Sequence, residues 1–235
     1  MTEARLHEWR IEPREYARQE NRRGRRHAFE YLDPARTALA VIDMVPFFVG
    51  ENPYCRGIVP NIRTLADELR SHGGTVAWVL PAKDGRTDAL NNEFYGPQIA
   101  KLFAASADGW LWPEFEVHDR DVQAKKTAAS AFFPGRSDLP AVLEQRGIDT
   151  VIVTGTVTNV CCESSARDAS TLGYRVILVA DGTAARRDED HNATLYTIYR
   201  SFGDVRTTDE VVGLIRDVDQ AGLRTRDSGT QTIRP

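Results

Sequence analysis

Short apolar runs recur through the middle of the chain, and this recurrence constrains the fold more than any other feature. Aliphatic residues dominate each run, and charged residues are rare until the run ends. Such runs are typical of strands that are buried on both faces of a parallel sheet. The runs are TALAVIDM (37–44), TVAWVLP (75–81), TVIVTG (150–155) and RVILVAD (175–181).

Segments with helical periodicity lie between these runs. Over 56–74, Ile58, Ile62, Leu65 and Leu69 recur at spacings of three and four before a glycine pair, which predicts a helix that ends there. The alternation of strands and helices predicts an α/β fold, a three-layer αβα, Rossmann-like domain with a mainly parallel six-stranded sheet and helices on both faces. Further helices are predicted over 138–147, 160–173, 188–203 and the end of 204–215, and further strands over 121–126 and the start of 204–215.

The chain divides into three parts. Residues 1–36 are rich in arginine and glutamate with little apolar periodicity, so we expect a charged N-terminal arm laid over the domain or over a neighbouring molecule. Residues 37–217 form the predicted single domain. Residues 218–235 are polar and contain glycine, which predicts a disordered or loosely docked tail. Within the domain, the aromatic stretch 83–112 is expected to form loops and a short helix near 95–105 that cover a pocket.

The composition indicates an ordinary soluble protein. A hydrophobic content of 41%, a charged content of 27% and a net charge of -4 exclude a disordered or membrane class and make nucleic acid an unexpected partner. Apolar runs stay below the roughly 18 residues of a membrane span, and the N-terminus lacks the apolar core of a secretory signal. We therefore expect a cytoplasmic protein without membrane association, whose three cysteines are thiols.

Three reactive side chains lie where predicted strands end, namely Asp43, Lys126 and Cys161. The carboxyl ends of parallel strands meet at one edge of the sheet, where ligands of open α/β folds bind. Cys161 is expected in the first turn of a helix, where free N–H groups and the helix dipole should ease ionisation of its thiol. Neighbouring helical positions lie about 100° apart, so Cys162 is expected to pack into the interior.

The sequence around these residues resembles the isochorismatase-like cysteine hydrolase family, which includes N-carbamoylsarcosine amidohydrolase, ureidoacrylate amidohydrolase, biuret hydrolase and nicotinamidase. The similar segments are AVIDMVPFF, KKTAASAFF and GTVTNVCCESSARDASTLGYRVILVADG, in order and spacing over roughly residues 36–215. The resemblance implies an Asp–Lys–Cys triad made of Asp43, Lys126 and Cys161. Lys126 is preferred over Lys125 because it lies four residues before Ser130 of the family's SAF signature, and because adjacent strand residues point to opposite faces.

The resemblance also implies a cis peptide bond between Thr156 and Val157, and an oxyanion hole formed by the backbone N–H groups of Val157 and Cys161. The implied activity is hydrolysis of a C–N bond in a small amide or ureido (N-carbamoyl) substrate through a thioester. No cofactor is implied. A metal site like that of nicotinamidases is not expected, because PAKDGRTDALNNEF after the second strand contains no histidine.

The oligomeric state and an arginine contact to substrate are predicted from the same resemblance, whereas the aromatic candidates are chosen from the sequence itself. A homodimer or homotetramer is expected, with the N-terminal arm as a strap between subunits. An arginine after the fifth strand is the candidate for binding a substrate carboxylate, because its planar fork suits that group. The candidate substrate-binding residues are Phe47, Phe48, Trp78, Phe132, Arg186 and Arg187.

Other interpretations remain open. An isochorismatase-type vinyl ether hydrolase would use the aspartate and carries another residue at the nucleophile position, so Cys161 argues against it. A non-enzymatic thiol redox sensor would use Cys161 beside Cys162 but would not need Asp43 or Lys126. A catalytically silent binding module is the third alternative.

Overall fold

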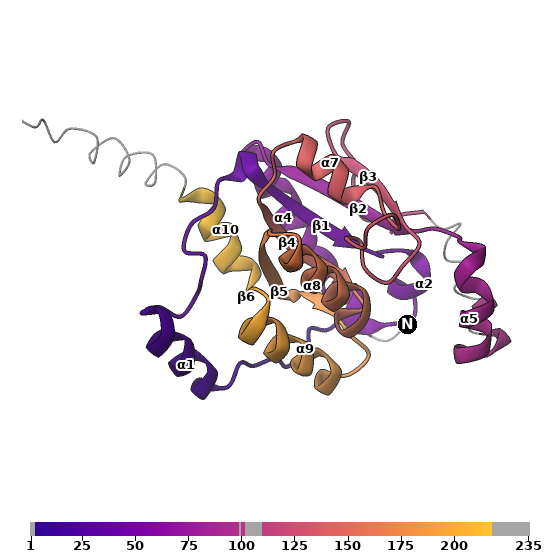
Figure 1. The fold of residues 1–235 in the computed structure, drawn as a ribbon, viewed down its shortest axis with the longest axis horizontal. Helices are drawn as coiled ribbons and strands as arrows, with labels where there is room; N and C mark the ends of the chain where they lie inside the picture. The colour runs from indigo at the N-terminus through magenta and orange to yellow at the C-terminus, as the bar shows by residue number, and fades with distance from the viewer. Residues whose placement is uncertain (1–2, 99, 102–109, 218–235) are drawn as a thin grey trace, which may run out of the picture.

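A six-stranded parallel sheet forms the centre of the molecule. The computed structural model describes residues 3–98, 100–101 and 110–217. All strand pairs are parallel, and the strand order is β3-β2-β1-β4-β5-β6 (Figure 1). The predicted α/β class with a parallel six-stranded sheet is therefore confirmed. The strands are β1 (Thr37–Ile42), β2 (Thr75–Pro81), β3 (Val122–Lys126), β4 (Thr150–Thr156), β5 (Arg175–Ala184) and β6 (Asp204–Arg206).

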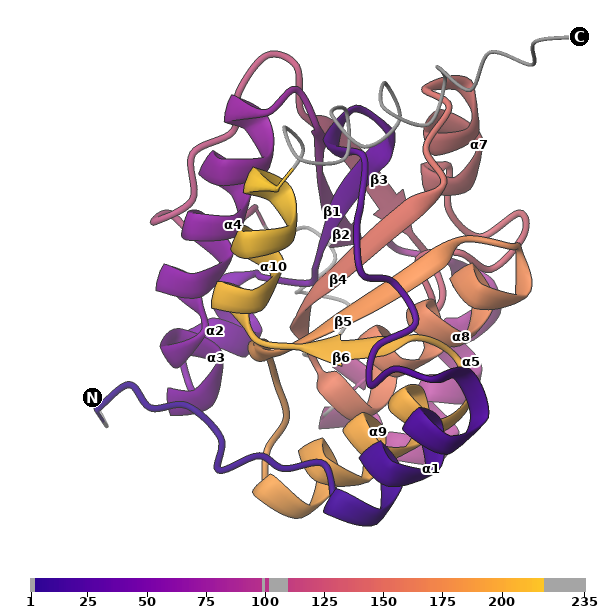
Figure 2. The same cartoon turned by 90° about the vertical axis from the view of Figure 1, so that its left-hand side faces the viewer.

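Helices cover both faces of the sheet, as Figure 2 shows. Along β1, Ala38, Ala40 and Ile42 belong to one buried cluster, whereas Leu39 and Val41 belong to the other. This alternation gives each face its own core. The first core packs under α7 (Leu139–Gln145), α8 (Glu163–Thr171) and α9 (Asp188–Ser201), and the second under α3 (Pro53–Gly57), α4 (Val59–Ser71) and α10 (Thr208–Arg216).

Two segments differ from the sequence-based prediction. The helix expected over 56–74 begins earlier, as α3 followed by α4, because Asn52 caps α3 by accepting from the Tyr54 N–H. The aromatic stretch contains α5 (Gly85–Tyr95), upstream of the helix expected near 95–105. Part of that expected helix lies outside the described residues, as does the predicted tail 218–235.

The strand order reverses between β1 and β4, because the chain runs outward through β2 and β3 before it returns to the other side of β1. Gly155 pairs with Ile42 at this point. Its φ is +105°, and a Cβ on it would lie 2.1 Å from the Ile42 carbonyl oxygen, so a glycine is required. The two central strands therefore approach closely where β1 ends. In this type of sheet, ligands bind where the strand order reverses.

The N-terminal arm lies over its own domain. It contains α1 (Pro13–Arg23) and the 3₁₀ turn η1 (Pro34–Arg36), and α1 packs beside α9 (Figure 2). The buried Asp204 carboxylate accepts hydrogen bonds from the N–H groups of Ala28 and Phe29, each 2.8 Å long. These contacts fix the arm to β6. The helices of the described residues are all too short or too polar to cross a membrane.

Candidate active site

Three side chains meet at the carboxyl edge of the sheet. Asp43 follows β1, Lys126 is the last residue of β3, and Cys161 lies in η2 (Thr158–Cys162), a π-helical turn between β4 and α8. The Lys126 ammonium is 2.8 Å from Asp43 Oδ2 and 3.6 Å from Cys161 Sγ. Parallel strands thus deliver a carboxylate, an ammonium group and a thiol from distant parts of the sequence to one point.

Asp43 leaves the strand in a left-handed conformation. Its N–H still donates to the Val79 carbonyl at 2.9 Å, but its φ is +54°, a value that aspartate adopts more readily than most residues. The side chain is buried, and the Oδ1 atom has no hydrogen-bond partner among the described residues. One carboxylate oxygen of Asp43 therefore pairs with Lys126, and the other oxygen is able to accept a proton.

Lys126 is oriented inward by the pleat of β3. Residues of this strand alternate between buried and exposed, so that Lys125 faces solvent and Lys126 is buried. Its ammonium also donates to the Ala128 carbonyl at 3.1 Å. Burial acts to lower the pKa of Lys126, but the neighbouring Asp43 charge and the Cys161 sulfur outweigh burial, and the net pKa is raised. Lys126 is therefore a permanent cation.

Cys161 is half-buried, and burial raises the pKa of its thiol to about 12, with the Asp43 charge adding to the rise. Lys126 and the Val157 N–H act in the opposite direction and do not cancel it. This differs from the easily ionised thiol that the sequence suggests. The physical reason is that desolvation and a neighbouring carboxylate both disfavour a second anion. The resting site therefore holds a thiol beside a carboxylate.

The turn that carries Cys161 is not the first turn of an α-helix. Val157 precedes η2, the peptide bond between Thr156 and Val157 is cis, and α8 begins only at Glu163. Cys162 is completely buried, with its Sγ 3.8 Å from the Thr154 carbonyl, so only Cys161 is accessible from the sheet edge. The packing of Cys162 agrees with a small apolar residue.

The aromatic candidates divide by burial. Phe47 and Phe48 are half-buried on α2 (Pro46–Val49), directly after Asp43. Phe132 is fully buried in the core under α7 and α8. Trp78 is 1% exposed in the other core, and its indole N–H donates to Asp121 at 2.8 Å. The structure thus places both Phe132 and Trp78 inside the fold, so neither ring is exposed to a substrate in the way that the sequence predicts. The position of Trp78 in β2 turns its ring toward α4.

The two candidate arginines follow β5 and are both exposed. Arg187 is the N-cap of α9, and its guanidinium binds the Asp190 carboxylate with two hydrogen bonds of 3.0 and 2.8 Å. Arg187 is therefore already paired with a carboxylate. Arg186 has no such pairing among the described residues and is the better candidate for a substrate carboxylate.

Sequence reasoning missed a buried contact behind the cysteine turn. His191 is 0% exposed, and its Nδ1 lies 3.0 Å from Thr158 Oγ1, the first residue of η2. The ring of His7 stacks on His191 with centroids 4.3 Å apart. Nothing in the sequence pattern links residues so distant. Within the described residues, no group of three or more histidine, cysteine or carboxylate side chains is placed to hold a metal ion.

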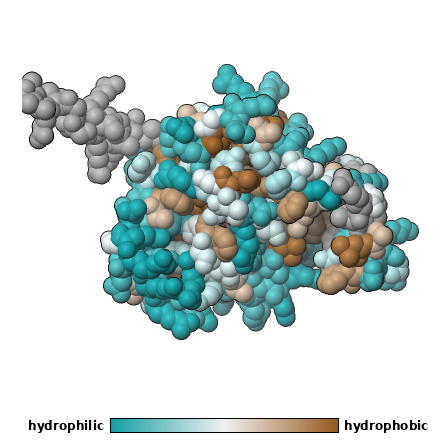
Figure 3. All heavy atoms as spheres, in the orientation of Figure 1, coloured by the Kyte–Doolittle hydropathy of each residue, from teal (hydrophilic) through white to brown (hydrophobic). Residues whose placement is uncertain are grey.

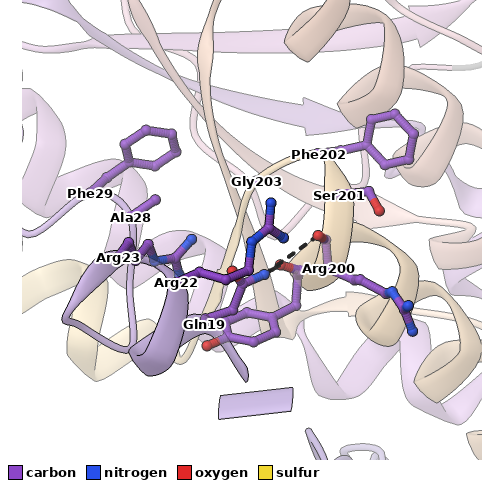
Figure 4. A pocket seen from close by; sticks show the side chains of 10 residues that line it. Gln19, Arg22, Arg23, Ala28, Phe29, Arg200, Ser201, Phe202 and Gly203 are labelled. Carbon is purple, nitrogen blue, oxygen red and sulfur yellow. Dashed lines mark hydrogen bonds between the residues drawn. The ribbon is translucent and has the colours of Figure 1, made fainter. Parts of the chain in front are cut away.

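A separate hollow lies at the opposite edge of the sheet, between α1 and the end of α9 (Figure 4). It has a volume of about 340 Å³ and includes Gly203, which precedes β6. Gln19 points across it, and its amide donates to the carbonyls of Tyr199 and Arg200 at 3.4 Å each. Because the strands are parallel, the start of β6 lies at the edge remote from Asp43 and Cys161. This hollow is therefore not the reaction site.

Apolar side chains are exposed on α5, which projects from the body (Figures 1 and 3). Leu90 is 61% exposed and Phe94 is 76% exposed. Exposed large apolar residues that gather on one element often mark a contact surface. The expected homo-oligomer remains a prediction, and α5 is the element on which an interface is best sought.

Comparison with known proteins gives one consistent result. The model of the Isochorismatase domain family matches residues 37–210. An uncharacterized isochorismatase family protein of Bacillus subtilis is 36% identical over 187 residues, covering 79% of this chain and 97% of that protein. A ureidoacrylate amidohydrolase of Agrobacterium fabrum is 28% identical over 211 residues, covering 78% and 92%.

Solved structures agree with the sequence comparison. A cysteine hydrolase from Pseudomonas syringae pv. phaseolicola superimposes with a TM-score of 0.72 at 30% identity, covering 81% of this chain and 97% of that one. An N-carbamoylsarcosine amidase from Thermoplasma acidophilum gives a TM-score of 0.63 at 26% identity, covering 74% and 97%. The family match over residues 37–210 therefore spans the whole sheet and the candidate site.

Proposed function

Because this chain belongs to the isochorismatase family of hydrolases, we propose that it is a cysteine-dependent amidohydrolase that cleaves a C–N bond in a small amide or ureido substrate. The observation that carries the proposal is the position of one ammonium group, 2.8 Å from Asp43 and 3.6 Å from Cys161. A nucleophile beside a base that a third group orients is the arrangement that covalent catalysis requires. The similarity to a ureidoacrylate amidohydrolase and an N-carbamoylsarcosine amidase supports the substrate class.

The reaction begins with proton transfer from Cys161 to Asp43. The sulfur then attacks the carbonyl carbon, a C–S bond forms, and the carbonyl oxygen becomes an anion. The backbone N–H groups of Val157 and Cys161 are the proposed donors to that oxygen, since preorganised N–H groups stabilise charge that develops in the transition state. Lys126 compensates the negative charge that passes between sulfur and carboxylate.

The intermediate collapses when the C–N bond breaks and Asp43 returns its proton to the leaving nitrogen. The products of this step are an amine or ammonia and a thioester on Cys161, or a thiocarbamate if the substrate is a urea. Water then attacks the acyl carbon while Asp43 accepts a proton from it. The C–S bond breaks as Asp43 returns this proton to the sulfur, which restores the thiol and releases the acid product.

The alternative interpretations fit the site less well. A redox sensor needs an accessible thiol of low pKa, whereas burial raises the pKa of Cys161 to about 12. A vinyl ether hydrolase would have no use for a thiol in contact with Lys126. A silent binding module would not need a buried cation, carboxylate and thiol at the same point.

The test is ammonia release from a substrate panel by purified protein. The panel contains N-carbamoyl amino acids, biuret, ureidoacrylate, maleamate and nicotinamide. Turnover of at least one of them that is lost in Cys161→Ala and kept in Cys162→Ala is the expected result. Turnover that survives Cys161→Ala, or the absence of turnover on the whole panel together with cleavage of a vinyl ether such as isochorismate, would overturn the proposal.

A further inference from the structure

The N-terminal arm reaches the turn that carries Cys161 through one buried histidine. The His7 side chain is 1% exposed. Its ring lies between two others, with centroids 3.8 Å from Tyr54 on α3 and 4.3 Å from His191 on α9, and all three rings are nearly parallel. The arm therefore contributes a ring to the interior of the domain.

Both ring nitrogens of His7 are fixed by hydrogen bonds. The Ala185 N–H donates to Nε2 at 2.9 Å, so Nε2 carries no proton. Nδ1 lies 2.6 Å from the Asp188 carboxylate, so this nitrogen carries the proton and donates. Neutral His7 matches its partners in this one tautomer, which sets both the position and the plane of the ring.

His191 connects the His7 ring to η2, the turn that carries Cys161. It is completely buried, with its Nδ1 3.0 Å from Thr158 Oγ1. Thr158 lies directly after Val157 and three residues before Cys161. The contact thus ends on the segment that holds both the nucleophile and the proposed oxyanion donors.

The surrounding arm is fitted to the same surface. The Arg5 N–H donates to the Pro53 carbonyl at 3.2 Å, and the Arg10 N–H donates to Asn192 at 2.8 Å. A Cβ on Gly57 would lie 2.0 Å from the Arg5 carbonyl oxygen, so the glycine allows the arm to approach. His7 therefore sits in a segment that is held on both sides.

We propose that His7 is a positioning residue of the catalytic centre, acting through His191 and Thr158 to hold the turn that carries Cys161. The inference rests on the proposed function for its kinetic consequences. Without the His7 ring, a cavity opens beside His191, whose own contact with Thr158 then loses its support. A shift of about 1 Å in a catalytic group costs about 10²-fold in rate, so loss of the ring lowers kcat about 10- to 100-fold while KM changes little.

The test is a double-mutant cycle with His7→Ala, Thr158→Val and the double variant, in the full-length protein. Two quantities are measured: kcat and KM for ammonia release, and the rate of Cys161 alkylation by iodoacetamide, followed by mass spectrometry. Each single variant is expected to lower kcat and to change the alkylation rate at least about threefold. The double variant is expected to be no worse than the worse single variant, because residues in one network are not additive.

A matched control comes from the same arm. Gln19→Ala removes a buried side chain that binds the end of α9 and does not touch η2. It is expected to lower the thermal midpoint while kcat and the alkylation rate stay unchanged. Equal alkylation changes in His7→Ala and Gln19→Ala, or strict additivity of His7→Ala and Thr158→Val, would show that His7 only stabilises the fold and would overturn the proposal.

The alkylation readout does not depend on the hydrolase assignment. If the panel gives no turnover and a vinyl ether is cleaved instead, the proposed function fails, and the alkylation cycle still decides the role of His7. If His7→Ala does not fold, His7→Leu fills part of the space and removes the aromatic ring together with both hydrogen bonds. An alkylation rate in His7→Leu equal to that of the wild type would then overturn the proposal, and a changed rate would support it.

Discussion

Lys126 and Asp43 form an ion pair of 2.8 Å in which both side chains are almost completely buried. Such a pair adds little to stability, because removing two charges from water costs about as much as their attraction returns. The ion pair matters for the chemistry of the site rather than for stability. The ammonium contacts both the carboxylate and the Cys161 sulfur, so it stabilises a negative charge on whichever of the two has lost a proton.

Removal of the cation should therefore abolish turnover. Lys126→Met leaves a buried carboxylate without its counter-ion, which typically costs about 3–5 kcal/mol of stability, and we expect kcat to fall by at least about 10³-fold. The control is Lys125→Met, since Lys125 is exposed on the same strand. Steady-state kinetics and denaturant unfolding of both variants check this, and comparable losses in the two would contradict it.

Asp43→Asn should separate thiol reactivity from turnover. The Asp43 charge contributes to the raised pKa of Cys161, while Lys126 opposes it. Replacing the carboxylate by an amide removes one group that raises the pKa of Cys161 and leaves the Lys126 cation, which lowers it. The pKa of Cys161 should therefore fall. We expect faster iodoacetamide alkylation near neutral pH, with its pH midpoint displaced downward, together with loss of hydrolysis. An unchanged alkylation profile would mean that Asp43 does not act on the thiol.

Stability should decline on mild acidification because of the buried histidines. Burial lowers the pKa of His7 and lowers that of His191 to about 3; the charged groups facing His7 are Asp188, which raises its pKa, and Arg5, which lowers it. As the pH falls below about 6.5, these two histidines therefore become protonated in the unfolded chain but stay neutral in the folded chain. The stabilisation is complete above about pH 6.5 and is lost as the pH falls toward the folded values, by about 1.4 kcal/mol per pH unit for each histidine.

Denaturant unfolding of the wild type and His7→Phe at several pH values between about 7.5 and 5 measures this slope. The free energy of unfolding of His7→Phe should depend less steeply on pH than that of the wild type, and the difference should equal the contribution of one histidine. His118→Gln is the control, because the His118 side chain is 47% exposed. Parallel slopes in all three proteins would refute the assignment to His7.

Two glycines should respond to alanine in opposite directions. Gly155→Ala places a Cβ 2.1 Å from the Ile42 carbonyl at a φ of +105°, and we expect a loss of more than about 3 kcal/mol. Gly213 lies inside α10, and a methyl group added to it would have nothing within 4 Å, so Gly213→Ala should gain about 0.5–1 kcal/mol from helix propensity. Unfolding midpoints of the two variants report both changes.

The strands and the orientation of Lys126 could be predicted from sequence because both depend on local periodicity. The run TALAVIDM and the alternation of VQAKK specify burial residue by residue. The face of the sheet on which a buried ring lies is not a local property, which is why sequence reasoning directs Trp78 to the pocket whereas the ring lies in the core under α4. The periodicity of a sequence identifies a strand, but it does not identify the face of the sheet that a ligand contacts.

The electrostatic state of Cys161 also escapes sequence reasoning. A position after a strand suggests the favourable field of a helix N-terminus, whereas burial and the Asp43 charge determine the pKa. Those two causes arise only when β1 and β4 lie side by side. The contact of His7 with His191 is non-local in the same way, because the two rings come from opposite ends of the described chain.

The docking of the arm has a consequence for the order of events during synthesis. The surfaces that receive His7, Gln19 and Ala28 lie on Ala185, α9 and Asp204, which leave the ribosome long after the arm. The arm must therefore stay solvated until β5, α9 and β6 have been made. A nascent chain that stops before Ala185 would present the turn that carries Cys161 without the contacts of His7 and His191 behind it.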